Sequence, residues 1–302
     1  MNKIPTVEVV IPVFNEEKNI KFILADVIKQ RNYNFTLKRI TIMSDGCTDN
    51  TVNFAKEVGK NSKIPIIVIH NHERRGKYAV LNQYFPLVES DIVVHCDGDI
   101  LLKEDAISIM VEKFMTNPDL TMVWAKCILL PPVNYIEKVN TCGYEIFSYI
   151  RDKMGDRAMK YYACGRLYSA KGDFYKTINI KPIIEEDAYI FYLSVQNDLK
   201  NLYCENAIAM YRGASSLKEY LIQAKRVRLN SLSKYFDKEL LKKWESIKFT
   251  DMARGALRFF PKNPFYVSSY VFLWIFAFII SKFSKTDINW YMISSSKTLI
   301  KE

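Results

Sequence analysis

From residue 7 to about residue 130, apolar stretches of strand length alternate regularly with longer segments of helical pattern. The strand-length stretches are Val7 to Val13, Ile40 to Met43, Pro65 to Ile69, Asp91 to Cys96 and Thr121 to Leu130. This alternation is typical of a mostly parallel sheet covered by helices on both faces. With 302 residues, 49% of them hydrophobic, the chain can bury such a sheet in a large core. The predicted fold class is therefore α/β.

Polar residues follow three of the predicted strands at the point where each strand ends. They are Asn15-Glu16 after the first strand, Ser44-Asp45-Gly46 after the second and Asp97-Gly98-Asp99 after the fourth. Ligands of open parallel sheets bind at the carboxyl ends of the strands. We therefore expect the three loops to form one site.

The sharpest chemical signal is Asp97-Gly98-Asp99, which directly follows an apolar strand. Hard divalent cations such as Mg2+ and Mn2+ take oxygen ligands, and a cation held by carboxylates can bridge to a nucleotide diphosphate. An Asp-Gly turn is also a common loop element that binds nothing, and for the motif alone this is the more frequent case. Its place at the carboxyl end of a strand favours the metal and diphosphate clamp.

Five other segments are informative together with this motif. In chain order they are Val9-Val10-Ile11-Pro12-Val13-Phe14-Asn15-Glu16, Ser44-Asp45-Gly46-Cys47-Thr48-Asp49, Arg75-Gly76-Lys77, Glu185-Glu186-Asp187 and Gln223-Ala224-Lys225-Arg226-Val227. In this order they resemble the motifs of glycosyltransferase family 2, over about residues 7 to 229. The resemblance implies a GT-A type fold, which is a Rossmann-like, mostly parallel sheet with flanking helices. It also implies inverting, metal-dependent sugar transfer from a nucleotide-diphosphate donor.

The same resemblance assigns expected roles to single residues. Donor binding is expected of Pro12, Asn15, Glu16, Asp45, Gly76, Lys77, Asp97, Gln223 and Arg226. Asp97 and Asp99 would hold Mg2+ or Mn2+. Asp187, with Glu186 as the neighbouring candidate, would be the catalytic base that takes a proton from the acceptor hydroxyl. A cation and an arginine would stabilise the charge on the departing diphosphate.

Each of these segments also has a purely structural interpretation. Acidic residues before an apolar run, as at Glu185-Glu186-Asp187, often mark a helix N-terminus. Gln223 and Arg226 fit the solvent-facing side of a basic helix, and Gly76-Lys77 fits a loop-to-helix junction. The order of all six segments along the chain favours the enzymatic interpretation.

Two positions depart from the family pattern. Ser44 stands where the family has the first aspartate of its nucleotide-base loop, which weakens a preference for uridine. Val227 stands where processive synthases have a tryptophan that stacks on the acceptor sugar, which argues against processive synthesis. Residues 131 to 215 are less regular and are expected to complete the same domain.

The C-terminal part combines positive charge with apolar sequence. Residues 212 to 262 contain 13 Lys or Arg against 5 Asp or Glu, so +8 of the net charge of +10 lies there. Residues 249 to 260 have an amphipathic helical pattern, and the uncharged residues 263 to 281 are at the short end of segments that span a bilayer. A buried core helix is the alternative. Basic residues beside an apolar segment favour an anionic membrane surface over nucleic acid as the partner.

We therefore predict a GT-A glycosyltransferase domain over residues 1–233 and a basic, amphipathic and apolar membrane-associating helical region over residues 234–302. The N-terminus lacks a signal-peptide pattern, so we expect the enzyme at the cytoplasmic face of the cell membrane. The resemblance favours a UDP-hexose or UDP-N-acetylhexosamine donor, and membrane proximity favours a lipid-linked or glycan acceptor. A sugar-1-phosphate nucleotidyltransferase and a non-catalytic membrane-bound scaffold stay open as alternatives.

Overall fold

The computed structural model describes residues 4–31, 34–228, 232–244, 247–282 and 294–299. Its strands are β1 (Thr6–Val13), β2 (Thr36–Asp45), β3 (Ile66–Asn71), β4 (Ile92–Cys96), β5 (Ile100–Leu102), β6 (Leu120–Leu129), β7 (Leu167–Lys171) and β8 (Lys200–Tyr211). Its α-helices are α1 (Ile20–Ile28), α2 (Thr51–Asn61), α3 (Lys77–Tyr84), α4 (Ala106–Thr116), α5 (Tyr135–Met154), α6 (Met159–Tyr162), α7 (Gly172–Thr177), α8 (Glu186–Gln196), α9 (Leu217–Arg228), α10 (Lys238–Trp244), α11 (Phe249–Phe259) and α12 (Pro264–Lys282). Short 3-10 helices are η1 (Phe85–Leu87), η2 (Gly155–Ala158), η3 (Leu232–Lys234) and η4 (Ser294–Lys297).

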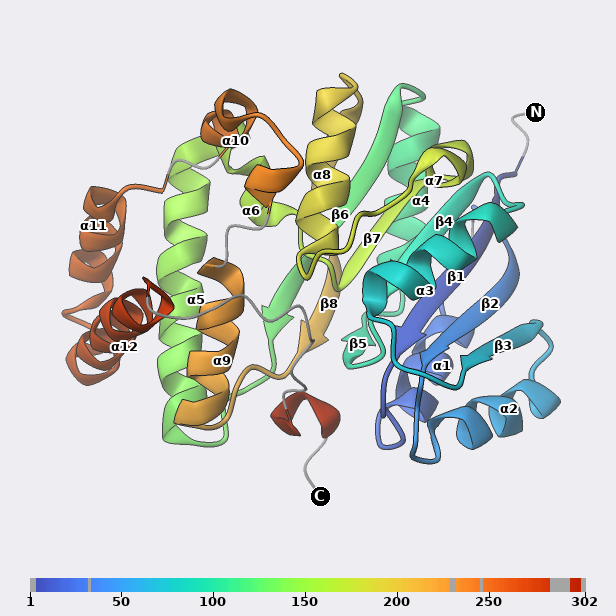
Figure 1. Ribbon diagram of the computed structural model, residues 1–302, viewed down its shortest axis with the longest axis horizontal. Coiled ribbons are helices and arrows are strands. Elements are labelled where there is room, and N and C mark those ends of the chain that lie inside the picture. The colour runs from blue at the N-terminus through green and yellow to red at the C-terminus, as the bar shows by residue number, and fades with distance from the viewer. Residues whose placement is uncertain (1–3, 32–33, 229–231, 245–246, 283–293, 300–302) are drawn as a thin grey trace.

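The eight strands of the described residues form one sheet in the order β3-β2-β1-β4-β7-β6-β8-β5 (Figure 1). β3, β2, β1 and β4 pair in parallel, and so do β6 and β8. β7 runs antiparallel to β4 and β6, and β5 runs antiparallel to β8. The predicted α/β class, with a mostly parallel sheet and flanking helices, is confirmed. The five strands expected before residue 131 are β1, β2, β3, β4 and β6.

The inner strands serve two separate cores, because successive side chains of a strand point to opposite faces of the sheet. On β1, Val9 and Ile11 join a cluster that includes the buried residues of α1 and α4, whereas Val10 joins a cluster with α3 and α8. On β4, Val94 joins the first cluster and Val93 the second. Strands covered on both faces are apolar at nearly every position, which is why these runs were recognisable in the sequence.

Residues 131 to 215 are more regular than expected. They contain the longest helix of the described residues, α5, together with the strands β7 and β8 that complete the sheet. The side chain of Asn134 caps α5 by accepting a hydrogen bond from the Glu137 N–H at 2.9 Å. The buried stripe of α5 includes Cys142 and Gly143, and such small residues weaken the apolar period by which a helix is recognised.

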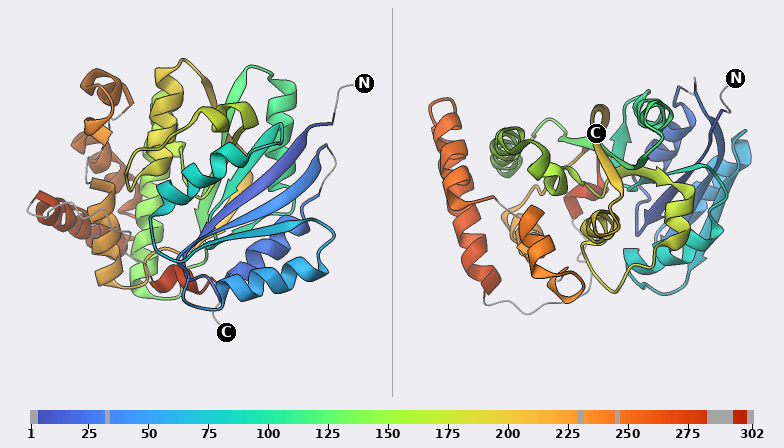
Figure 2. Two further views of the ribbon diagram at one scale, coloured as in Figure 1. Left: turned by 45° about the vertical axis from the view of Figure 1, so that its right-hand side comes forward. Right: turned by 90° about the horizontal axis from the view of Figure 1, so that it is seen from above.

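The two expected C-terminal segments form the helices α11 and α12, which lie at the edge of the molecule opposite β3 (Figures 1 and 2). One side of α12 is buried, with Val267, Tyr270 and Leu273 in a cluster with residues of α5 and α9. Along the ranges given above, none of the helices has the length and apolarity needed to cross a membrane. The domain boundary at residue 233 stays a prediction.

Candidate active site

A cavity of about 380 Å³ opens where β1, β2 and β4 end, at the place predicted for the three polar loops. The predicted site residues that line it are Pro12, Glu16, Asp45, Lys77, Asp97, Asp99, Glu186, Asp187 and Gln223. Asn15 and Gly76 are not among its lining residues. The side chains of Arg226 and Val227 lie outside the described residues, so their predicted roles rest on the sequence.

Lys77, the first residue of α3, is buried between two carboxylates. Its Nζ lies 2.7 Å from Asp97 Oδ1 and 2.6 Å from Glu186 Oε1, and it donates to the Gly165 carbonyl oxygen at 3.3 Å. Burial alone would lower the pKa of Lys77, but the two carboxylates outweigh it and raise that pKa. Lys77 therefore stays charged and ties the Asp97-Gly98-Asp99 turn to the start of α8.

The two candidate bases, Glu186 and Asp187, have different surroundings. Burial raises the pKa of Glu186 to about 7, although the ammonium of Lys77 opposes the shift. Asp187 accepts backbone hydrogen bonds at both oxygens, from the Gly165 N–H and from the Ala188 N–H, each at 2.8 Å. The carboxylate of Asp187 is thus held in one orientation at the cavity wall.

His95 is a site residue that the sequence did not reveal, since it has no metal-ligand partner at the usual spacing. It lies on β4 two positions before Asp97, and its Nε2 donates to Asp97 Oδ1 at 3.3 Å. Its ring stacks on Tyr168 with a centroid distance of 4.4 Å. Burial and the nearby charge of Lys77 lower the pKa of His95 to about 4, so the imidazole is neutral at pH 7. One feature of the sequence could have indicated this contact: side chains two positions apart along a strand point to the same face, and His95 and Asp97 have that spacing.

Asp97 is ionised because of these neighbours. Burial would raise its pKa, but the ammonium of Lys77 and the hydrogen bond from His95 hold that pKa well below its usual range. Such a carboxylate keeps its negative charge at neutral pH. It is therefore suited to bind a cation.

Asp45 and Asn15 hold the loops around the cavity. Asp45 accepts from the N–H groups of Arg75 and Gly76 at 2.7 and 2.9 Å, which fixes the turn into α3. Gly76 has a φ of 93°, a conformation that favours glycine. Asn15 accepts from the Thr48 N–H at 2.9 Å and so ties the first loop to the second. Their predicted contacts with the donor remain predictions.

Several basic side chains of the cavity were not expected as site residues. Arg74 lies 4.0 Å from the centroid of the Phe14 ring, and Arg166 lies 3.7 Å from that of Tyr211. Lys297 comes from the C-terminal end of the described residues, where no motif drew attention to it. These residues are distributed over segments that only the fold brings together.

Comparison with protein families identifies the family of the chain. The model of glycosyl transferase family 2 matches residues 8–173, which is more than half of the chain. The chain belongs to glycosyl transferase family 2. The matched region contains the first four of the six predicted motifs, including the Asp97-Gly98-Asp99 turn. The protein is thus a glycosyltransferase, and not the nucleotidyltransferase that the sequence left open.

Curated relatives of this glycosyltransferase match part of its length. The poly-beta-1,6-N-acetyl-D-glucosamine synthase of Staphylococcus aureus is 28% identical over 131 residues, which is 43% of this chain and 31% of that protein. The protein of the same name from Staphylococcus epidermidis is 27% identical over the same shares. The aligned region thus covers less than a third of these relatives.

Solved structures match the glycosyltransferase over most of its length. A mannosyltransferase from Pyrobaculum calidifontis, in complex with GDP-Man and Mn2+, has a TM-score of 0.61 at 15% identity and covers 94% of this chain and 77% of its own. Glucosyl-3-phosphoglycerate synthase from Mycobacterium tuberculosis, in complex with Mn2+, UDP and phosphoglyceric acid, has a TM-score of 0.53 at 15% identity, with coverage of 81% and 80%. These similarities confirm the predicted GT-A fold.

Proposed function

We propose that this glycosyltransferase moves a sugar from a nucleotide-diphosphate donor to an acceptor hydroxyl, with inversion at the anomeric carbon. The proposal rests on one observation: Asp97 and Asp99 of one turn line the same cavity as Asp187, which comes from a distant segment, α8. Asp97 and Asp99 are suited to bind a cation together with the diphosphate, and Asp187 is suited to accept the proton of the acceptor hydroxyl. The presence of both parts disfavours a non-catalytic scaffold.

In the proposed reaction, the acceptor oxygen forms a bond to the anomeric carbon while the bond from that carbon to the diphosphate breaks. The diphosphate leaves with the electron pair, and the acceptor proton passes to Asp187. Hydrogen bonds from Gly165 and Ala188 orient this carboxylate. Glu186 is the second candidate, but its carboxylate pairs with the Lys77 ammonium, whose charge opposes uptake of a proton, whereas the hydrogen bonds to Asp187 come from neutral backbone groups. We therefore favour Asp187 as the base.

The residues of the cavity fit a divalent cation, either Mg2+ or Mn2+. Asp97 is ionised, and Asp99 lines the same cavity. Within the ranges that the structure describes, no three or more His, Cys, Asp or Glu side chains are grouped to hold a metal ion by themselves. Phosphate oxygens of the donor would complete the coordination, and the cation would offset charge on the leaving group. Gln223, and Arg226 on the same helix, are proposed to bind the donor.

The donor is proposed to be a UDP-N-acetylhexosamine or a UDP-hexose. The curated relatives are named for a product made of N-acetyl-D-glucosamine, which favours the first of the two. The acceptor is proposed to be a lipid-linked or other glycan.

Calorimetry with UDP and Mn2+ tests the donor and metal proposal. We expect binding by the wild-type protein that EDTA or Asp99→Asn abolishes, because paired carboxylates without a cation repel a diphosphate. Asp173→Asn is the matched control, since Asp173 is exposed and lies outside the cavity lining. UDP binding of equal strength with and without metal would contradict the proposal.

A location at an anionic membrane surface is proposed from the outer side of α11 and α12. Phe272 of α12 and Leu257 of α11 are 67% and 72% exposed, and Phe265, Phe276, Phe278 and Ile279 are exposed as well. The basic side chains of Arg254 and Arg258 on α11 are exposed beside them. Exposed aromatic side chains next to positive charge are typical of helices that lie in a membrane interface.

Flotation with vesicles of phosphatidylglycerol and phosphatidylcholine tests this location. Replacement of Phe272 and Phe276 by serine should weaken vesicle binding by about tenfold or more, because burial of one such ring contributes about 1.5–3 kcal/mol. Ile67→Ser, an exposed apolar position on β3, is the control and should change nothing. Equal binding of all variants, or no binding by the wild-type protein, would refute the membrane proposal.

A further inference from the structure

The C-terminal end of the described chain returns to the donor cavity. η4 and the two residues after it lie beside α9 and the nearby end of the sheet (Figure 1). Ser296 and Lys297 of this segment line the cavity together with the Asp97-Gly98-Asp99 turn. Residues from opposite ends of the chain thus share one wall.

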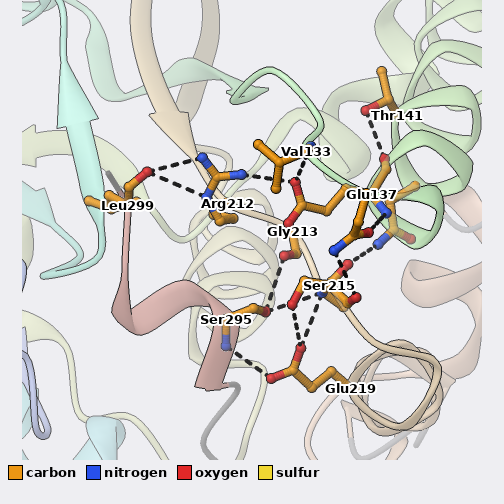
Figure 3. A network of polar contacts seen from close by, with 12 residues as sticks. Val133, Glu137, Thr141, Arg212, Gly213, Ser215, Glu219, Ser295 and Leu299 are labelled. Atoms are coloured by element: carbon orange, nitrogen blue, oxygen red, sulfur yellow. Dashed lines mark hydrogen bonds and ion pairs between the residues drawn. The ribbon is translucent and has the colours of Figure 1, made fainter. Parts of the chain in front are cut away.

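Two sets of hydrogen bonds fix this segment, one on either side of Lys297. The Ser295 N–H donates to Glu219 Oε1 at 2.9 Å, and the Leu299 carbonyl accepts from Arg212 Nη2 at 3.1 Å (Figure 3). Leu299 itself is buried. Neither set uses the side chain of Lys297, so the backbone position of this residue does not depend on its ammonium group.

The ammonium group of Lys297 lies against the first loop of the site. Its Nζ donates to the Phe14 carbonyl oxygen at 2.8 Å and forms an ion pair with Glu16. Glu16 in turn packs against the metal motif, since a Cβ atom at Gly98 would lie 3.0 Å from Glu16 Cγ. One side chain therefore separates Lys297 from the proposed cation-binding turn.

We propose that Lys297 is a donor-binding residue, whose ammonium donates to the diphosphate of the nucleotide sugar. This inference rests on the proposed function, because it requires a nucleoside diphosphate in the cavity. An ammonium has three donors, and the Phe14 carbonyl and Glu16 account for two of them. A diphosphate at the Asp97-Gly98-Asp99 turn brings negative oxygens to the wall that Lys297 forms. The four-carbon side chain lets Nζ follow those oxygens while the backbone stays in place.

A simpler role for Lys297 is neutralisation of Glu16 alone. That role predicts a general effect on the loop, felt by any ligand of the cavity. Contact with the diphosphate predicts an effect on nucleotides that carry phosphates and none on the corresponding nucleosides. The two roles therefore differ in a measurable way.

Calorimetry in the presence of Mn2+ should compare UDP and GDP with uridine and guanosine, for the wild-type protein, Lys297→Met and Lys297→Arg. We expect Lys297→Met to lose about 10- to 100-fold in affinity for the bound diphosphate, as is usual for loss of a charge-assisted hydrogen bond. Lys297→Arg should keep most of the affinity, and nucleoside binding should not change. Lys176→Met, an exposed lysine outside the cavity lining, is the matched control.

Equal diphosphate affinity of Lys297→Met and the wild-type protein would overturn the inference and leave the proposed function intact. A parallel loss of nucleoside and diphosphate affinity would also overturn it, because the role would then be structural. Absence of diphosphate binding by the wild-type protein would overturn the proposed function together with the inference.

Discussion

The cavity beside the Asp97-Gly98-Asp99 turn and the helical side of the molecule around α5 are held together in different ways. At the cavity, opposite charges form ion pairs, as in the contacts of Lys77 with Asp97 and Glu186. Around α5, apolar residues of α9, α11 and α12 form a continuous cluster. Charges buried beside a cavity are costly unless they are paired, whereas apolar contacts stabilise wherever they exclude water. Changes at the cavity should therefore affect chemistry and stability together, and changes around α5 should affect stability alone.

The largest effect is expected from Asp187→Asn, which tests the chemical half of this comparison. Asparagine keeps the size and hydrogen bonding of the side chain but cannot take the acceptor proton. The rate of sugar transfer should fall by about 10²- to 10⁴-fold, while the affinity for UDP with Mn2+ changes little. If Asp187 serves only the start of α8, the asparagine variant should stay nearly fully active, because asparagine suits a helix N-terminus about as well. Glu186 would then become the residue to test.

Lys77→Met tests whether charge pairing also supports the fold at the cavity. The variant leaves the buried carboxylate of Glu186 and the half-buried carboxylate of Asp97 without their cation, which should lower the free energy of unfolding by about 3–5 kcal/mol in urea titrations. Lys176→Met, at an exposed ion pair, should change it by less than about 1 kcal/mol. The double variant with Glu186→Gln should regain part of the loss, because one of the two unpaired charges is removed.

The pH dependence of the Lys77→Met variant follows from Glu186. Its pKa in the folded protein is raised from 4.5 to about 7, so between these values the folded state holds a proton that the unfolded state has released. Stability contributed by this group therefore falls as pH rises through that window. Without Lys77 the pKa of Glu186 in the folded protein rises further. The decrease in the free energy of unfolding caused by Lys77→Met should therefore be larger at pH 8 than at pH 5. A loss that is the same at both pH values would contradict this account.

The same contrast explains what the sequence could and could not predict. The strands and the loops at their ends were predictable, because each depends on residues that are close in sequence, whereas the metal-binding role of the Asp97-Gly98-Asp99 turn stays a prediction. Lys77 was assigned to the donor, but its contacts with Asp97 and Glu186 join three segments, and no local pattern records them. Lys297 follows no motif at all, and only the path of the chain brings it to Glu16.

On the helical side, the uncharged, apolar character of α12 was visible in the sequence, but the helix that packs against it was not. Its partner α5 was not recognised as a helix, since its contact surface includes Cys142 and Gly143. Small residues allow close approach, and they carry little hydrophobic signal of their own. The mixed character of α12, buried on one side and exposed on the other, therefore became clear only from the packing.

The smallest effect is expected from Gly143→Ala, which tests the packing half of the comparison. A Cβ atom at Gly143 would lie 2.2 Å from Cε2 of Tyr270, so the buried ring of α12 rests directly on the backbone of α5. Alanine favours a helix by about 1 kcal/mol over glycine, but overpacking at a buried contact costs about 1–3 kcal/mol. Because the contact is too short for a small adjustment to relieve, we expect a net loss of about 1–2 kcal/mol in the free energy of unfolding.

Urea titration measures the loss in the free energy of unfolding for Gly143→Ala. The control is Glu145→Ala, which introduces alanine at an exposed position of the same helix and so reports helix propensity without the buried contact. Adding Tyr270→Leu should remove the overlap with the ring, so that the two changes together cost less than the sum of their separate effects. Affinity for UDP with Mn2+ should be the same in the wild-type protein, in Gly143→Ala, in Tyr270→Leu and in the double variant, because neither Gly143 nor Tyr270 lines the cavity. Strict additivity would mean that α12 does not rest on α5 at this contact. A change in UDP affinity would mean that the two sides of the molecule are coupled.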